Sequence, residues 1–81
     1  NHKLIAKMKN NFIMDMKRKY YLDYNDEHFN NVISKKTNIP ESVIEELKKR
    51  FNQAEKTNYA DDEDLNNIYF LIEKFHNTEN E

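Results

Sequence analysis

The chain has 81 residues with no glycine, no cysteine and one proline, and its formal net charge is −2. Phosphate-binding loops, dinucleotide-binding turns and nucleophile elbows use glycine where the backbone needs positive φ, so the composition argues against these active sites. The lack of cysteine excludes disulfides and thiolate metal sites. We therefore predict one all-α domain over residues 1–81, a compact arrangement of three to four helices, and expect no enzymatic activity.

The first helix is expected over residues 3–22, where apolar side chains recur at steps of three and four. This spacing places them on one face of the helix, which is formed by Ile5, Met8, Phe12, Met16 and Tyr20. Lysines flank the face on both sides, as is typical of an amphipathic helix at the surface of a small domain.

The second helix is expected over residues 26–37 and the third over residues 40–55. Asn25 can cap the second helix, because its side-chain oxygen can accept a hydrogen bond from a free backbone N–H. Pro40 suits the first turn of the third helix, where its missing N–H has no partner to lose.

The segment between these two helices resembles a helix-turn-helix over residues 32–47. Small Ser34 allows the helices to cross closely, and Asn38 lies where a left-handed residue ends many helices. Ile39 can fill the corner and Ile44 can anchor the second helix of the pair. The sequence therefore predicts a helix-turn-helix-like central hairpin.

The fourth helix is expected over residues 62–76, and residues 77–81 are expected to form a frayed tail. Asp61 can cap this helix, and the acidic residues of its first turn favour the positive end of the helix dipole. The run over residues 61–64 lacks the ligand spacing of a calcium loop. No histidine or carboxylate set elsewhere has metal-ligand spacing, so neither a metal nor a cofactor is expected.

Charge is distributed unevenly along the chain: +5 over residues 1–22, −1 over residues 23–54 and −6 over residues 55–81. A basic segment suits an acidic protein, nucleic acid or anionic lipid, although exposed charge is also the ordinary state of a helix surface. The candidate interaction surface consists of basic residues from the first and third helices with one tyrosine, namely Lys9, Lys17, Arg18, Lys19, Tyr21, Lys48, Lys49 and Arg50.

Nucleic-acid binding by the helix-turn-helix is the alternative function. A recognition helix presents the side chains of its first turns to base edges. Here those turns carry Glu41, Glu45 and Glu46, which phosphates repel, and the basic run over residues 48–50 follows only later. We therefore expect a protein partner in preference to nucleic acid.

Several stretches carry a family resemblance: HKLIA at 2–6 running into Phe12, RKYYLD at 18–23, KKTNIPE at 35–41, Leu65-Asn66, and IEKF at 72–75. Together they resemble the C-terminal tail of an uncharacterised family of Bacteroidota membrane proteins. That family typically has glycine at the position of Asn38, a change that keeps the turn. In the family a domain of unknown function precedes a membrane helix, this tail follows it, and the genes lie near those of MoxR-type ATPases.

The resemblance implies a non-catalytic cytosolic helical domain of a membrane-anchored protein, on the cytoplasmic side of the inner membrane. We expect it to act as a protein-interaction module. A basic first helix following a membrane span also agrees with positive-inside topology, and it would suit contact with anionic lipid headgroups.

Overall fold

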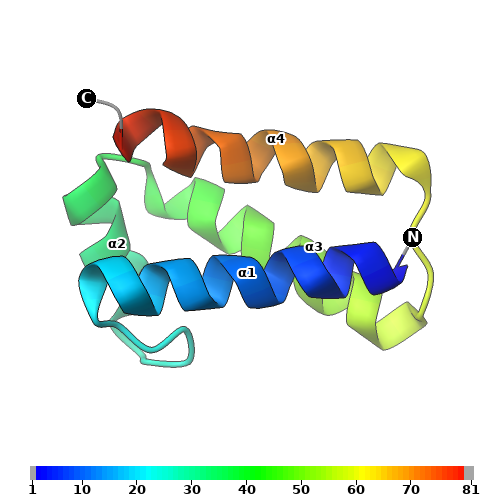
Figure 1. Cartoon of the computed structure of the whole chain (residues 1–81), viewed down its shortest axis with the longest axis horizontal. Helices are drawn as coiled ribbons and strands as arrows, with labels where there is room; N and C mark the ends of the chain where they lie inside the picture. The colour runs from blue at the N-terminus through cyan, green and yellow to red at the C-terminus, as the bar shows by residue number, and fades with distance from the viewer. Residues whose placement is uncertain (1, 80–81) are drawn as a thin grey trace.

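The computed structural model describes residues 2–79, and all of their regular secondary structure is helical (Figure 1). The four helices are α1 (His2–Tyr20), α2 (Phe29–Thr37), α3 (Glu41–Thr57) and α4 (Asp62–Glu79). No strand occurs within the described range. The predicted all-α class is therefore confirmed.

The first helix ends at Tyr20, two residues before the predicted end at residue 22. Tyr21 adopts a left-handed conformation with φ of 55°, and its backbone N–H donates a 2.9 Å hydrogen bond to the carbonyl oxygen of Lys17. A left-handed residue at this position stops the helix and turns the chain away, in the manner of an αL C-cap.

The second helix begins at Phe29 and not at residue 26, so the predicted cap at Asn25 is wrong. The carboxylates of Asp23 and Asp26 accept hydrogen bonds from the backbone N–H groups of Asn25 and His28, at 3.0 and 2.8 Å. Such side-chain bonds offer the backbone an alternative to helix, and here they hold the three residues before Phe29 in a turn.

The turn between α2 and α3 has the features that the sequence predicted. Asn38 is left-handed, with φ of 61°, and Ile39 is buried. Pro40 lies just outside α3 as its N-cap, with ψ of 144°, so the helix proper begins one residue later than predicted. The use of this hairpin as a helix-turn-helix stays a prediction.

The third helix extends to Thr57, two residues beyond the predicted end, and left-handed Asn58 terminates it. The hydroxyl of Thr57 donates a 2.9 Å hydrogen bond to the carbonyl of Gln53, one turn earlier. The extension leaves a shorter connection to α4 than the predicted helix ends at residues 55 and 62 implied.

The fourth helix starts where the sequence predicted, behind a reciprocal cap. The backbone N–H of Asp64 donates to the Asp61 carboxylate at 2.8 Å, and the N–H of Asp61 donates to the Asp64 carboxylate at 3.2 Å. The predicted tail over residues 77–81 is wrong for residues 77–79, which continue the helix. Residues 80 and 81 lie outside the described range.

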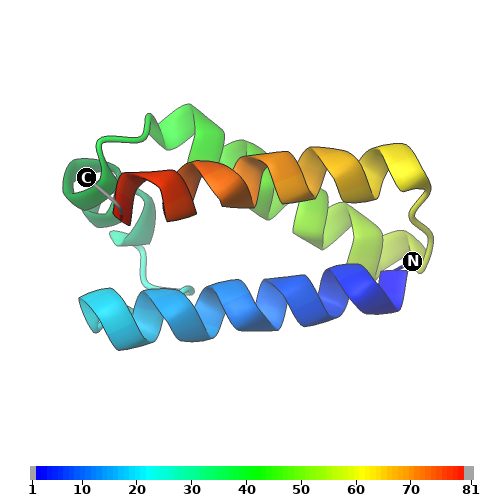
Figure 2. The same cartoon turned by 45° about the horizontal axis from the view of Figure 1, so that its top comes forward.

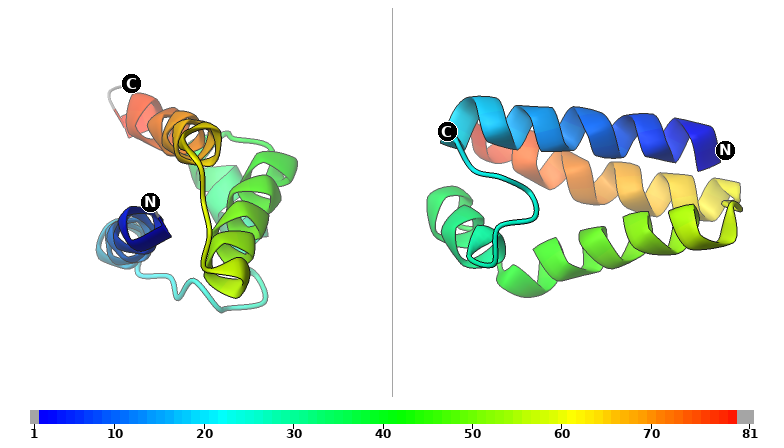
Figure 3. Two further views of the ribbon diagram at one scale, coloured as in Figure 1. Left: turned by 90° about the vertical axis from the view of Figure 1, so that its right-hand side faces the viewer. Right: turned by 90° about the horizontal axis from the view of Figure 1, so that it is seen from below.

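Three long helices lie side by side and α2 packs at one end of them (Figure 3). α1 and α4 run in the same direction, and α3 runs in the opposite direction (Figure 2). α3 packs along both α1 and α4, whereas the direct contact between α1 and α4 is slighter. This arrangement leaves the α1–α4 side of the molecule without a helix opposite α3.

One phenylalanine from each helix meets at the centre of the core. The ring centroid of Phe12 lies 5.1 Å from that of Phe75, 6.2 Å from that of Phe51 and 6.5 Å from that of Phe29. All four side chains are at most 3% exposed. Aromatic rings dominate the energetics of small cores, so this cluster is the main link between the four helices.

Candidate functional site: the groove between α1 and α4

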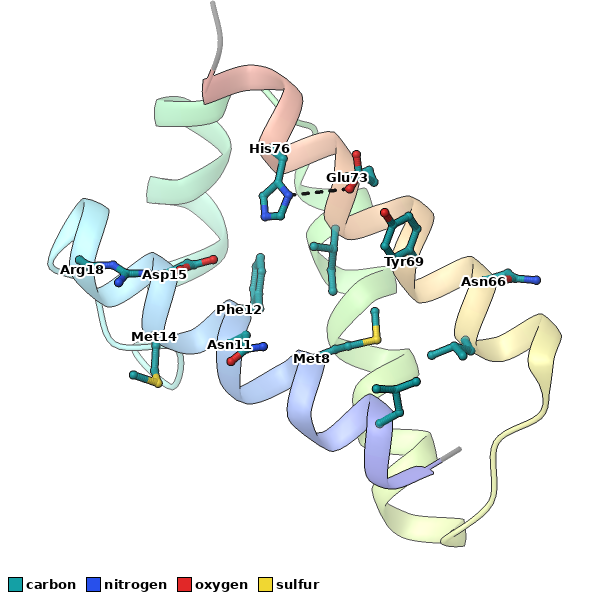
Figure 4. Close-up of a pocket in the computed structure, with 13 residues that line it drawn as sticks. Met8, Asn11, Phe12, Met14, Asp15, Arg18, Asn66, Tyr69, Glu73 and His76 are labelled. Carbon is teal, nitrogen blue, oxygen red and sulfur yellow. Dashed lines mark hydrogen bonds and ion pairs between the residues drawn. The ribbon is translucent and has the colours of Figure 1, made fainter.

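A groove of about 900 Å³ lies between α1 and α4 (Figure 4). From α1 it is lined by Leu4, Met8, Asn11, Phe12, Met14, Asp15 and Arg18, and from α4 by Leu65, Asn66, Tyr69, Ile72, Glu73 and His76. We call this feature the α1–α4 groove.

Helical periodicity explains how each helix contributes to this groove. On α1, residues 4, 8, 11, 15 and 18 recur at alternating steps of four and three, and on α4 residues 65, 69, 72 and 76 do the same. Residues at these steps share one face of a helix. On both helices this face lies beside the buried stripe that packs against α3, so the groove continues the apolar surface outward from the core.

The floor of the groove is apolar. Phe12 is buried in the core, and Met8, Leu65 and Ile72 are half-buried and pack against it. In Figure 4, Met8 and Phe12 point from α1 into the space between the two helices.

Three large apolar side chains stand exposed at the edges of this floor. Leu4 is 46% exposed, Tyr69 59% and Met14 63%. Exposed apolar groups gathered along a hollow are typical of binding sites, whereas the same groups scattered singly are ordinary.

Polar groups gather where α1 and α4 end. Arg18 forms an ion pair with Asp15, and Nδ1 of His76 lies 3.8 Å from a carboxylate oxygen of Glu73. Leu4 and Leu65 line the opposite end, where both helices begin. The charged lining residues are therefore gathered at one end of the groove.

The structure separates the eight predicted interaction residues into several places. Arg18 lines the α1–α4 groove, whereas Lys17 and Lys19 are exposed in the last turn of α1 and Tyr21, which follows it, is 90% exposed. The remaining four residues, Lys9, Lys48, Lys49 and Arg50, lie elsewhere. Lys9, Lys48 and Lys49 line a separate hollow of about 600 Å³. The eight residues thus do not share one hollow.

Lys48 is partly buried against the α1–α2 connection. Its Nζ donates a 3.1 Å hydrogen bond to the carbonyl oxygen of Tyr24 and lies 4.6 Å and 4.3 Å from the ring centroids of Tyr24 and Phe29. Burial lowers the pKa of the Lys48 ammonium. Because it bonds the α1–α2 connection from α3, we interpret Lys48 as a tether for that connection.

Tyr24 is the centre of this polar cluster. Burial, and secondly the negative charge of Glu55, raise the pKa of the Tyr24 hydroxyl to about 12. Lys9 pairs with Glu55 at 2.6 Å and lies 5.7 Å from the Tyr24 ring centroid. The cluster joins α1, α3 and the α1–α2 connection, so Lys9 also has a structural contact.

Arg50 is paired within α3, because its Nε lies 2.9 Å from a carboxylate oxygen of Glu46, one turn earlier. Of the basic run on α3, Lys49 is exposed, whereas Lys48 and Arg50 are partly buried. Two of the three cations expected to face a partner are thus engaged within the domain.

Sequence reasoning missed the α4 side of the groove entirely. The sequence contained a sign of this face, because Tyr69 and His76 recur with Leu65 and Ile72 at helical spacing. Together they form a face beside the one that packs against α3. The α1 residues that line the other side of the groove, however, lie some sixty residues away in the sequence, so local spacing does not reveal that the two faces meet.

The described residues hold neither a metal site nor a membrane-spanning helix. No group of three or more histidine, aspartate or glutamate side chains is placed to hold a metal ion within residues that the structure describes. Over the same range, no helix has the length and apolar character that crossing a membrane requires.

The protein is a small four-helix domain with the α1–α4 groove between two parallel helices. The chain belongs to the DUF4350 C-terminal helical domain family, whose model matches residues 1–79. No curated protein and no solved structure matches it. The predicted membership in an uncharacterised domain family is confirmed, whereas the Bacteroidota origin, the membrane context and the MoxR association stay predictions.

Proposed function

We propose that this domain is a non-catalytic protein-interaction module that binds an α-helix of a partner protein in the α1–α4 groove. The observation that carries the proposal is the apolar floor of a groove of about 900 Å³, bordered by exposed Leu4, Met14 and Tyr69. An amphipathic helix in a hydrophobic groove is a common mode of protein recognition.

The packing of the long helices supports a helix as the occupant. α3 contacts both α1 and α4, which contact one another only slightly, as diagonal members of a four-helix bundle do. A helix in the groove would lie opposite α3 and complete a four-helix arrangement with the three long helices. It would extend the shared core without moving any of the existing helices.

The length of the groove also suits a helix. Leu4 and Arg18 line its two ends, and the intervening turns of α1 span about 21 Å at 1.5 Å per residue. That length accommodates about four helical turns. A partner segment of roughly 15 residues would therefore cover the groove from end to end.

The membrane context belongs to the same proposal and rests on the family resemblance. We place the domain on the cytoplasmic side of the inner membrane, in a longer membrane-anchored protein. The start of α1 lies at the same end of the molecule as the acidic first turn of α4 (Figure 1). If a membrane span precedes α1, this acidic turn favours a protein partner over anionic lipid headgroups.

Nucleic-acid binding has less support than protein binding. Lys48 is engaged with Tyr24, Arg50 is paired with Glu46, and the first turn of α3 carries Glu41. Phosphates would therefore meet carboxylates at the part of α3 that a recognition helix uses to read bases.

Photo-cross-linking in the native cells tests the proposed function. Benzoylphenylalanine replaces Tyr69 at the groove or, as a matched control, Tyr59, which is 67% exposed and does not line the groove. We expect a protein adduct from position 69 whose partner peptide has apolar residues at helical spacing. An adduct from position 59 alone, or none from a folded variant at position 69, would contradict the proposal.

A further inference from the structure

We propose that the hollow lined by Lys9, Lys48 and Lys49 binds the phosphoryl group of a small phosphate monoester. Its volume of about 600 Å³ lies within the range of about 300–1,000 Å³ that is usual for small-molecule sites. We call it the lysine hollow. It shares no lining residue with the α1–α4 groove, so this inference does not depend on the proposed function.

Lys48 gives the lysine hollow a partly buried cation whose neighbours are neutral. Its Nζ donates to the carbonyl oxygen of Tyr24 and lies over the rings of Tyr24 and Phe29. Within the described part of the chain, no carboxylate forms an ion pair with it. Charges removed from water are normally paired, because desolvation disfavours the charged form, and burial lowers the pKa of this ammonium. An anion in the hollow would supply the missing counter-charge.

Lys49 adds a second cation that no carboxylate of residues 2–79 pairs with. It is exposed, follows Lys48 on α3 and lines the same hollow. Lys9 differs from these two, because Glu55 already pairs with it at 2.6 Å. A phosphate monoester carries a charge of about −1.5 to −2 at pH 7, which the two unpaired cations match.

Three asparagine side chains add neutral N–H donors from three parts of the fold. Asn25 lies in the α1–α2 connection, Asn30 on α2 and Asn52 on α3, and all three line the lysine hollow. Oδ1 of Asn30 is buried, so the amide Nδ2 is the polar side-chain atom that this residue can offer a ligand. Each amide nitrogen carries two donors.

The kind of donor favours phosphate over carboxylate. The described lining holds no arginine, whose planar fork binds carboxylates through two parallel hydrogen bonds. Ammonium groups bind phosphate as point charges, and ammonium and amide donors from several elements can together satisfy the three terminal oxygens of a phosphoryl group.

Glu45 is the one carboxylate in the described lining, and it opposes an anion. It lies one turn before Lys49 on α3, and both side chains are exposed. Because Glu45 is exposed, solvent and salt screen its repulsion. Glu45 therefore limits the affinity of the hollow without cancelling the charge of Lys48, and its removal should strengthen binding.

A titration of the isotope-labelled domain with glycerol phosphate, followed by NMR at constant ionic strength, tests the inference. We expect saturable shifts of the amide signals of Asn25, Asn30 and Asn52. The dissociation constant should be on the order of 1 mM, because a few charge-assisted hydrogen bonds form at a partly exposed site. The signals of Leu65 and Tyr69 in the α1–α4 groove should not move. Acetate should bind about five-fold more weakly.

Matched substitutions of exposed residues on α3 separate a site from general charge attraction. Lys49→Gln should weaken binding by about five-fold and Glu45→Gln should strengthen it by about two- to five-fold, as expected for single exposed charges. Lys56→Gln makes the same charge change as Lys49→Gln outside the lysine hollow, and it should alter the affinity by less than about two-fold. These side chains are exposed, so their replacement leaves the core intact.

Each other outcome overturns the inference or a stated part of it. Shifts that do not saturate, or equal weakening by Lys49→Gln and Lys56→Gln, overturn the site. Equal affinity for acetate overturns the phosphoryl assignment. Tighter binding of duplex DNA through the same amides, at equal phosphate concentration, assigns the hollow to nucleic acid and overturns the small ligand. None of these results bears on cross-linking from position 69, so this inference and the proposed function fail separately.

Discussion

Phe12 is the side chain whose removal tests the packing argument most directly, because it touches a phenylalanine from each of the other three helices. It is 3% exposed, and the nearest of the three ring centroids, that of Phe75, lies 5.1 Å away. Phe12→Ala would open a cavity where all four helices meet. Changes of this type cost about 3–5 kcal/mol, since the lost transfer free energy adds to the cost of the cavity.

That cost is large compared with the total stability of the domain. A chain of 81 residues is expected to have a free energy of unfolding of about 4–12 kcal/mol, at roughly 0.05–0.15 kcal/mol per residue. One kcal/mol corresponds to about 4–8 °C in the melting temperature of a domain of this size. We therefore expect Phe12→Ala to lower the melting temperature by at least about 12 °C, or to leave the domain partly unfolded at room temperature.

Urea unfolding followed by far-ultraviolet circular dichroism measures the effect. Phe70→Ala is the matched control, because Phe70 is 65% exposed and its ring contact is with the ammonium of Lys74 at 5.0 Å. This substitution should cost less than about 1 kcal/mol. Equal destabilisation by the two changes, or a cost below about 1 kcal/mol for Phe12→Ala, would refute the central role of the phenylalanine cluster.

Three further predictions concern the Tyr24 cluster, the start of α4 and nucleic acid. The folded state keeps the Tyr24 hydroxyl protonated up to a pKa of about 12, against 10 when unfolded, so its stabilising contribution is complete below pH 10 and is lost between pH 10 and 12. Thermal melts across this range should therefore fall more steeply for the wild type than for Tyr24→Phe, and parallel curves would contradict the assignment. Asp61→Ala should cost about 1 kcal/mol in urea unfolding, because it removes the acceptor for the Asp64 N–H, whereas Asp61→Asn should retain most of that stability. Fluorescence titration with duplex DNA at low salt should show no binding, and binding that weakens steeply with salt would revive the nucleic-acid alternative.

Much of the fold follows from local patterns that are legible in the sequence. The three-four spacing of Ile5, Phe12 and Met16 identified the buried face of α1, and all three are at most 3% exposed. Asn38 and Asp61 marked the end of one helix and the start of another, because the groups that they satisfy lie within a few residues.

The errors at helix ends also have local causes. At the start of α2, the Asp23 and Asp26 carboxylates bind backbone N–H groups that a longer helix would have used. At the end of α1, left-handed Tyr21 stops a helix that apolar spacing alone would continue. The start of α2 was thus misplaced because side chains bind its backbone N–H groups, and the end of α1 because one residue turns left-handed.

The sequence by itself determined the all-α class, the core faces of the helices and the approximate positions of the four helices, because these depend on spacing and on hydrogen bonds between near neighbours. Only the tertiary structure decided which charged side chains remain exposed. In the sequence Lys48 resembles any surface lysine, whereas in the folded domain its ammonium lies over the rings of Tyr24 and Phe29. The α1–α4 groove likewise exists only because two helices, separated in the sequence by two others, lie parallel on one side of α3 with their unused apolar faces adjacent.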